Sequence, residues 1–477
     1  MIGYVILAAV ILFIAVIIIR TLLFTPKENI KADDSVISFD SDSSVKALCE
    51  LVKCKTVSYR ESALEDDSEF EKLIFLLPTL YPNVFEKCSF DRLPDRALLF
   101  KWEGEKHDSP AVMMAHYDVV PVNEEMWDKP PFEAIIEDGV IWGRGTLDTK
   151  VTFNAILSSA ENLIKKGFTP KNDIYFAFSG GEEINGDGAK NIVDHFEKNG
   201  ITPAFVLDEG GAVVENVFPG VKAPCGMIGI AEKGMMNLQY KVKSGGGHAS
   251  APKPGSPVVA LSRACTALED KPFKYHITPP VAKMFDTLGR HSTFLYRMIF
   301  ANLWLFSGVL NMICKASGGE LNALVRTTVA FTQTKGSNAE NVIPPEATMV
   351  SNIRLNPYDT MDSALSYIKK TINNDKVELS VINGMNPSRI STTDCEGWDK
   401  VASAVASTWK GCIVSPYLMV QCSDCRHWGR LSDRVFRFSA MDLTSEERAT
   451  IHGNNERIRI DCANRATEFY IRLMSKC

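Results

Sequence analysis

The sequence predicts an α/β protein with a mostly parallel sheet flanked by helices, a smaller inserted α+β domain and an N-terminal transmembrane helix. Three observations lead to this fold class. Between residues 45 and 230, short apolar runs alternate with amphipathic stretches, as in a parallel sheet covered by helices. Between residues 233 and 381, strand-like runs at 235–242 and 347–355 flank a helical middle. Residues 1–19 contain no charged side chain, and a bilayer span needs about 20 apolar residues.

The first element is expected to be an uncleaved membrane anchor over residues 1–24, followed by a polar tether over residues 25–44. A cleaved signal peptide is the alternative, but a basic start and a small-residue cleavage site are not clear in this sequence. Arg20, Lys27 and Lys31 follow the apolar run and no basic residue precedes it, so the positive-inside tendency places the bulk of the chain on the cytoplasmic side. The twelve scattered cysteines do not settle the compartment, and the side of the membrane stays open.

The rest of the chain is interpreted as a main domain, residues 45–232 and 388–477, interrupted by an inserted domain, residues 233–387. With 477 residues and 45% hydrophobic content, the chain can bury a large core. The net charge of −6 and the lack of a basic block after the N-terminal region indicate that nucleic acid is not a partner. The segment 294–314 is the second most apolar stretch. Its polar residues, such as Arg297 and Asn302, favour a buried or pocket-lining helix over a second membrane span.

A histidine and several acidic residues come directly after the predicted strands of the main domain. His116 ends an apolar run, and residues i and i+2 of an extended segment point the same way, so Asp118 can hold its second ring nitrogen. Further acids stand at the other strand ends or strand-to-helix turns: Asp148, Glu182, Glu183, Asp208 and Glu209. Any one of these acids could be a helix N-cap. Open α/β sheets place their sites at the carboxyl ends of strands, so the series indicates one functional site.

Carboxylates that converge on one point repel each other unless a cation neutralises them, and a pair of divalent ions does this well. Histidine together with carboxylates favours zinc over calcium or magnesium, which prefer oxygen ligands. A second histidine ligand must come from elsewhere, and His452 in a Gly-Asn-Asn setting is the best candidate. The sequence therefore predicts two zinc ions in each chain.

Eight segments in order resemble the aminoacylase and carboxypeptidase S family of dinuclear zinc hydrolases, in the branch of the N-fatty-acyl-amino-acid synthase/hydrolases. The segments are AHYDVVPV, GRGTLDTK, GGEE, DEGG, EKGMMNL, GGHASAP, NVIPPEA and IHGNNE. The resemblance covers nearly all of the chain from about residue 45. It implies a zinc-peptidase-like main domain that is catalytic and a ferredoxin-like inserted domain that acts as a lid, and it leaves a homodimer open.

The resemblance also implies a role for each matching residue. Asp148 would bridge the two zinc ions. His116 and Asp208 would complete one site, and Glu183 and His452 the other. Glu182 would be the general base, with Asp118 behind His116. In the lid, His248 would polarise the scissile carbonyl, Asn341 would lie near the same oxygen, and Arg354 would bind a substrate carboxylate. One departure is Cys425, where the family shows a serine or small residue.

The implied activity is hydrolysis of the amide bond of N-acyl amino acids, including fatty-acyl ones, or of small dipeptides with a free carboxylate. A Gly-X carboxypeptidase or dipeptidase is the first alternative. A catalytically silent, membrane-tethered binding protein is the second, but it would require a missing ligand or a missing Glu182. A transporter component is disfavoured by the single clear span. We expect the segment 294–314 to line the acyl pocket and the lid to bring His248 to the site by closing over it.

Overall fold

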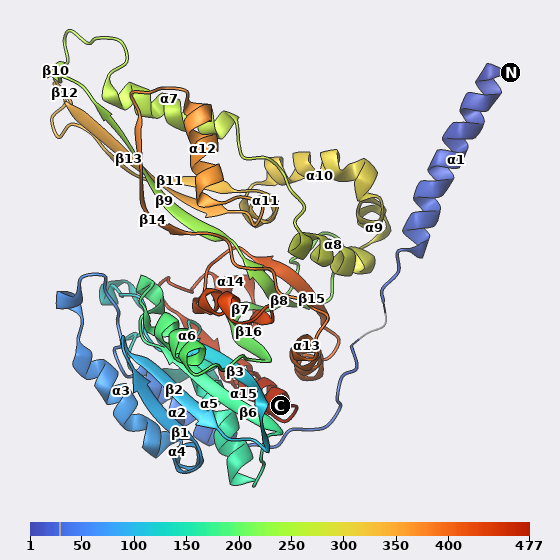
Figure 1. Ribbon diagram of the computed structural model, residues 1–477, viewed down its shortest axis with the longest axis vertical. Helices are drawn as coiled ribbons and strands as arrows, with labels where there is room; N and C mark the ends of the chain where they lie inside the picture. The colour runs from blue at the N-terminus through green and yellow to red at the C-terminus, as the bar shows by residue number, and fades with distance from the viewer. Residues whose placement is uncertain (28–29) are drawn as a thin grey trace.

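An eight-stranded, mostly parallel sheet forms the centre of the main body in the computed structural model, which describes residues 1–27 and 30–477 (Figure 1). Its strand order is β1-β2-β6-β3-β7-β16-β8-β15. The bounds are β1 (Ser89–Leu93), β2 (Ala97–Trp102), β3 (Lys106–His116), β6 (Asn172–Ser179), β7 (Phe205–Val214), β8 (Cys225–Glu232), β15 (Ile413–Met419) and β16 (Val435–Leu443). The neighbours β6, β3, β7 and β16 run parallel, and so do β8 and β15. The predicted α/β class with a mostly parallel sheet is confirmed.

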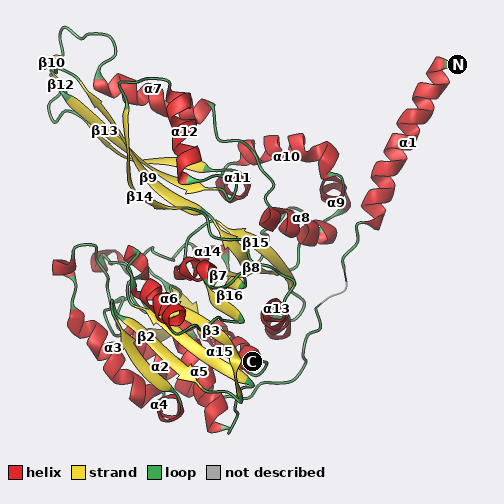
Figure 2. Cartoon of the chain, in the orientation of Figure 1, coloured by secondary structure: helices red, strands yellow, loops and turns green. Residues whose placement is uncertain are grey.

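Both faces of this sheet are covered by helices (Figure 2). Alternate residues of a strand point to opposite faces: Met113 of β3 packs into the larger core, and Val112 and Met114 pack into the core on the other face. Burial on both faces explains why the strands read as continuous apolar runs. The larger core is closed by α2 (Ser41–Val52), α3 (Asp67–Leu80), α4 (Pro82–Lys87), α5 (Lys150–Lys165), α13 (Glu396–Thr408) and α15 (Ile460–Met474), and the smaller one by α6 (Gly188–Lys198) and η4 (Asp424–Arg430).

A second, antiparallel sheet of four strands has the order β11-β13-β9-β14. Its strands are β9 (Gly234–Lys243), β11 (Thr328–Lys335), β13 (Glu346–Leu355) and β14 (Glu378–Met385), with α7 (Pro257–Asp270) and α12 (Met361–Ile372) packed on it. This βαββαβ arrangement has the ferredoxin-like order that the resemblance implied. A short pair, β10 (Gly247–His248) and β12 (Val342–Ile343), lies at the far tip of the sheet (Figure 1).

Residues 279–325 belong to the inserted segment but pack elsewhere. They form α8 (Pro279–His291), α9 (Phe294–Ala301), α10 (Leu303–Ser317) and α11 (Gly319–Val325). Their buried side chains share a core with β8 and β15 of the eight-stranded sheet, not with the ferredoxin-like sheet. The boundaries at residues 233 and 387 remain our interpretation, and within them the chain builds two separate structural parts.

The N-terminal helix α1 (Ile2–Leu23) extends away from the body beside α9 and α10 (Figure 1). By length and composition it is the one continuous helix among the described residues that could cross a membrane, while α9 and α10 pass the same test only as a pair bent by 114°. The remaining elements are short: β4 (Ile135–Glu137), β5 (Val140–Trp142), β17 (Arg457–Arg459), α14 (Ser445–Arg448), η1 (Ser62–Leu64), η2 (Glu124–Met126) and η3 (Glu182–Ile184).

Candidate functional site

The predicted ligands come together at the carboxyl ends of the central parallel strands. His116 is the last residue of β3 and pairs with Ser179, the last residue of β6, so the Glu182–Glu183 turn that follows β6 emerges beside it. Asp148 lies in the turn before α5, and its peptide bond to Thr149 is cis. His452 is carried by a loop near the C-terminus and has a positive φ of 59°. The sheet topology therefore gathers residues that are more than 300 positions apart.

Asp148 occupies the centre of this cluster. One carboxylate oxygen, Oδ1, lies 3.0 Å from His116 Nε2, and the other, Oδ2, lies 3.0 Å from His452 Nε2. His452 Nε2 is also 3.1 Å from Glu183 Oε2, and His116 Nε2 is 3.5 Å from Glu209 Oε1. One carboxylate thus faces two histidines, each with a further acid beside it, which is the arrangement expected of a bridging ligand.

The electrostatics of the cluster fit a pair of divalent cations. Burial raises the pKa of Glu182 well above its usual range, and burial raises the pKa of Glu209 to about 8. Hydrogen bonds to Asp148 and Glu183 raise the pKa of His452 to about 10. The buried oxygen Oε1 of Glu183 has no hydrogen-bond partner. The acids outnumber the histidines that could compensate them, and bound cations would neutralise the excess and satisfy this oxygen.

The structure places Glu209, and not the predicted Asp208, beside His116. Asp208 Oδ2 accepts a hydrogen bond from the backbone N–H of Cys425 at 2.9 Å, within η4. Neighbouring residues of a strand point to opposite faces. Phe205 and Leu207 face the larger core, so Glu209 shares their side and Asp208 faces η4. The sequence signal was present in the acidic pair DEGG, but strand alternation does not select Glu209, because His116 shares the face of Val112 and Met114 and only the packed structure shows that Glu209 reaches its ring.

Asp118 orients two parts of the cluster at once, as a residue behind His116 should. His116 Nδ1 lies 3.0 Å from the backbone oxygen of Asp118 and 3.3 Å from its Oδ1. The Asp118 carboxylate also accepts the backbone N–H groups of Glu182 and Glu183, at 3.1 and 3.2 Å, and the hydroxyl of Ser58 at 2.7 Å. Asp118 therefore couples the ring of His116 to the turn that carries the proposed base.

The sequence analysis missed a second positioning residue, Glu456. This buried carboxylate accepts the backbone N–H groups of Gly145, Leu147 and Asp148 through Oε1, at 3.1, 2.7 and 3.2 Å. Its other oxygen pairs with the buried guanidinium of Arg144. Glu456 is the final residue of the segment IHGNNE, and its function is to hold the turn that presents Asp148.

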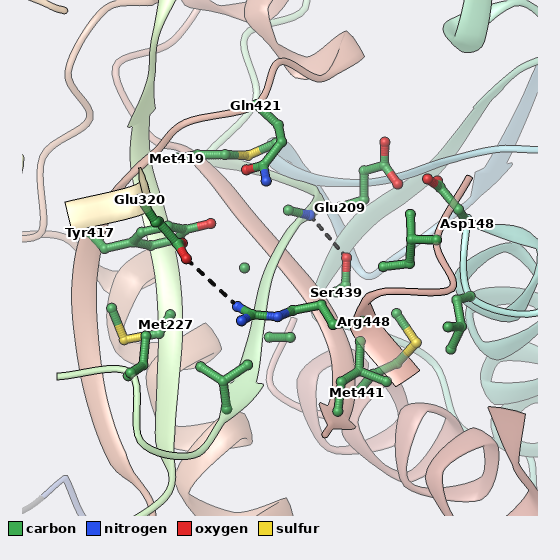
Figure 3. A pocket seen from close by; sticks show the side chains of 18 of the residues that line it. Asp148, Glu209, Met227, Glu320, Tyr417, Met419, Gln421, Ser439, Met441 and Arg448 are labelled. Carbon is green, nitrogen blue, oxygen red and sulfur yellow. Dashed lines mark hydrogen bonds and ion pairs between the residues drawn. The ribbon is translucent and has the colours of Figure 1, made fainter. Parts of the chain in front are cut away.

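A cavity of about 490 Å³ joins the cluster to an apolar chamber (Figure 3). Asp148, Glu182, Glu209 and His452 line it at the polar end. The apolar lining includes Phe218, Met284, Leu288, Leu321, Leu324 and Met441. Arg448 and Glu320 form an ion pair of 4.0 Å across this wall.

The residues that line this cavity differ from those that we expected to line the acyl pocket. None of residues 294–314, all of which are described, lines the cavity. The chamber lies instead between the strands and the flanking helices α8 and α11, because α9 and α10 pack outside them. Trp304, which we expected near an acyl chain, is 58% exposed.

The three predicted lid residues lie in two different places, one near the cavity and two far from it. Arg354 of β13 lies near the cavity, with Nη1 3.3 Å from the sulfur of Cys422, a residue of the cavity wall. His248 and Asn341 are exposed at the tip of the ferredoxin-like sheet, where the backbone oxygen of Asn341 accepts the N–H of Ala249 at 3.0 Å. Neither of these two residues lines the cavity of its own chain. Cys425 is buried and, like Cys422, a free thiol.

Comparisons with known proteins agree with this geometry. The profile of peptidase family M20/M25/M40 matches residues 112–476. The N-fatty-acyl-amino acid synthase/hydrolase PM20D1 of Xenopus tropicalis is 36% identical over 98% of this chain and 93% of the relative. The probable carboxypeptidase S-like protein 2 of Dictyostelium discoideum is 34% identical over 96% of this chain and 91% of the relative.

Solved structures show the same fold at low sequence identity. An M20 family metallo-carboxypeptidase from Sulfolobus solfataricus has a TM-score of 0.66 and 18% identity, with 91% of this chain and 98% of that chain covered. A dinuclear metal-binding M20 peptidase from Bacillus subtilis has a TM-score of 0.55 and 12% identity, with 91% and 98% covered.

Proposed function

Because the chain belongs to peptidase family M20/M25/M40, a family of metallopeptidases, we propose that it is a zinc-dependent hydrolase that cleaves the amide bond of N-fatty-acyl amino acids. The observation that carries this proposal is the continuity between the histidine–carboxylate cluster and the apolar cavity. A histidine-containing ligand set favours zinc over magnesium or calcium. The names of the relatives from Xenopus and Dictyostelium support an acyl amino acid or peptide substrate with a free carboxylate.

In this proposal Asp148 would help to hold both zinc ions, with His116 and Glu209 for one and Glu183 and His452 for the other. When bound, the ions would polarise the substrate carbonyl and lower the pKa of the attacking water. Glu182 lines the same cavity without a hydrogen bond to either histidine. Its carboxylate takes a proton from the water and delivers it to the departing amine nitrogen.

The apolar chamber would hold the acyl chain, since each buried methylene contributes about 0.8 kcal/mol. The amino acid part would then extend toward Cys422, where the Arg354 guanidinium can pair with the substrate carboxylate. This placement separates the two ends of the substrate on either side of the cluster. It also gives Arg354 the function that the resemblance implied.

His248 is best supplied by a second copy of the chain, which revises the expected closure of the lid. The strand β9 begins next to the cavity, where the sulfur of Cys422 lies 3.4 Å from the backbone oxygen of Lys233. Its ten residues extend roughly 30 Å toward the tip that carries His248. Rotation about the start of β9 keeps that distance, so closure within one chain does not bring His248 to the cluster. A homodimer in which the tips are exchanged would do so.

Co-expression of two inactive variants tests this arrangement. We expect His248→Ala and Glu182→Ala chains to be inactive alone and to recover about a quarter of wild-type activity together, because half of randomly paired dimers are mixed and one of their two sites is intact. The control is co-expression of Glu182→Ala with Glu183→Ala, which share one site and should not complement. No recovery in the first pair would place His248 in its own chain's site, and full activity of His248→Ala alone would place it outside the mechanism.

The substrate class is tested with the zinc-loaded full chain in detergent, against N-oleoyl-phenylalanine and a panel of Gly-X dipeptides. We expect turnover of the oleoyl substrate, because only this class fills the apolar chamber. Turnover of dipeptides alone would support the dipeptidase alternative. Failure to hydrolyse either class with both zinc ions present would support the silent binding protein.

We further propose that α1 is an uncleaved membrane anchor. Its 22 residues rise about 33 Å, enough to cross a hydrocarbon core of about 30 Å. The full chain should therefore remain with membranes during carbonate extraction and keep its first residues on N-terminal sequencing. Recovery of a chain that begins after residue 24 would indicate a cleaved signal sequence.

A further inference from the structure

One face of α10 is apolar and uncovered. Trp304, Leu305, Val309, Met312 and Ile313 are all exposed, and their spacing places them on one side of the helix. No charged residue occurs between residues 303 and 314. Among the residues that the structure describes, Phe13 of α1 contacts Trp304, but all five side chains stay exposed. Contiguous apolar surface of this kind marks an interaction site.

The opposite face of α10 is apolar as well. Leu310 and Cys314 are buried in the core that α8, β8 and β15 share. A polar stripe of Ser307, Asn311 and Lys315 separates these two apolar faces along one edge of the helix. Since one side of α10 already packs on the protein, the other side requires a second apolar surrounding.

The membrane-spanning candidate α1 is held against the elbow between α9 and α10. Asn302 at the elbow is fully buried, and its Nδ2 donates to Thr21 Oγ1 and to the backbone oxygen of Ile17, at 3.3 and 3.4 Å. Arg20 donates from Nε to Asn302 Oδ1 at 3.1 Å and from Nη2 to the backbone oxygen of Ala301 at 3.0 Å. These polar contacts fix the position of α1 relative to the exposed face of α10.

An aromatic contact shows at which level of α1 the exposed face of α10 lies. The rings of Phe13 and Trp304 meet edge to face with centroids 6.0 Å apart. Phe13 precedes the end of α1 at Leu23 by ten residues, which corresponds to about 15 Å along the helix axis. The hydrocarbon core is about 30 Å thick, so Phe13 lies near the midplane, and Trp304 reaches about as deep as the leaflet nearer to the catalytic body extends. The bend of 114° between α9 and α10 is compatible with an element that enters a leaflet and turns back.

We propose that the elbow formed by α9 and α10 is embedded in this leaflet beside α1 and binds lipid acyl chains. The proposal rests on the membrane anchor proposed above. It gives the catalytic body two contacts with the bilayer, so that the body has a fixed orientation and is not a freely rotating domain on a tether. Phe300 of α9 packs against Phe218, a residue of the cavity wall, with ring centroids 4.7 Å apart and the rings tilted by 36°. The embedded elbow is therefore one layer of side chains away from the proposed acyl chamber.

The fluorescence of Trp304 can report whether α10 contacts lipid. All seven tryptophans lie in the described part of the chain, and Trp304 is the one that is exposed. The full chain is reconstituted into phosphatidylcholine vesicles with and without acyl-brominated phosphatidylcholine. We expect a blue-shifted emission component that brominated lipid quenches and that Trp304→Phe removes. Unquenched, water-like emission from Trp304 in chains that stay with the vesicles during carbonate extraction would overturn the elbow proposal but leave the anchor intact.

A matched pair of charge substitutions tests whether the whole face is embedded. Val309 on α10 is 43% exposed and Val258 on α7 is 47% exposed. A carboxylate is costly in hydrocarbon but not in water, so Val309→Asp should lose most of the quenching of Trp304 and Val258→Asp should retain it. Equal quenching in both variants would contradict the proposal. Blue-shifted emission that lipid does not quench, together with cross-linking of chains through α10, would identify a second copy as the occupant and also overturn it.

Discussion

Replacing Glu182 with alanine is expected to lower kcat by about 10²- to 10⁴-fold, the range for a general acid–base group, while two metal ions stay in each chain. Glu182 lines the cavity and forms no ion pair with either histidine, although its carboxylate lies within 4.8 Å of the ligand atoms of His116 and Glu209, whereas Glu183 Oε2 lies 3.1 Å from His452 Nε2. Loss of the Glu182 carboxylate removes the proton acceptor and leaves the proposed ligands in place. Metal content by atomic absorption and kcat on N-oleoyl-phenylalanine measure the two effects separately.

The adjacent substitution provides the control. Glu183→Ala should lose bound metal together with activity, because a carboxylate that bridges His452 to the cluster is gone. The two variants remove the same chemical group from adjacent positions. A difference in metal content between them therefore reflects the position of the carboxylate and not a general loss of stability. If Glu182→Ala loses metal and Glu183→Ala keeps it, the two roles are reversed. Full activity of Glu182→Ala would exclude the proposed mechanism.

Leu321→Asp is expected to reduce kcat/KM for N-oleoyl-phenylalanine by about 100-fold or more and to leave N-acetyl-phenylalanine little affected. Leu321 is a half-buried residue of α11 on the apolar wall of the cavity. A carboxylate there opposes burial of methylenes, and loss of three to four buried methylenes at about 0.8 kcal/mol each corresponds to about 100-fold. The measurement is a chain-length series from acetyl to oleoyl, with all substrates in the same detergent.

Leu365→Asp is the matched control for this wall. Leu365 is similarly half-buried, but it packs in the core of the ferredoxin-like sheet. It should affect acetyl and oleoyl substrates equally. If Leu321→Asp also affects both substrates equally and lowers the melting temperature, Leu321 is a packing residue and the chamber does not hold the acyl chain.

Much of the fold followed from local patterns. The run AVMMA before His116 is continuous and apolar because β3 is buried on both faces, and the same reasoning identified β6 and β7. The strands β9 and β13 were recognisable from the change in character after residue 233. Local patterns did not show that residues 279–325 leave the ferredoxin-like sheet. Their apolar faces are compatible with several neighbours, and only the complete packing selects β8 and β15.

The sequence by itself determined the chemistry of the site, because acids and a histidine at the ends of neighbouring parallel strands must meet at one edge of the sheet. It also determined the family, since the order of the motifs is a property of the chain. Only the tertiary structure showed which way the side chains face and how far each predicted residue lies from the cavity. The packing of the strand ends placed Glu209 beside His116 and Asp208 beside η4. The length of β9 carried His248 away from its own cavity, and the packing of α8 and α11 made the apolar wall that we had assigned to residues 294–314. These contacts and distances involve segments that are far apart in the sequence. A local sequence pattern does not show which way a side chain faces after such segments pack together.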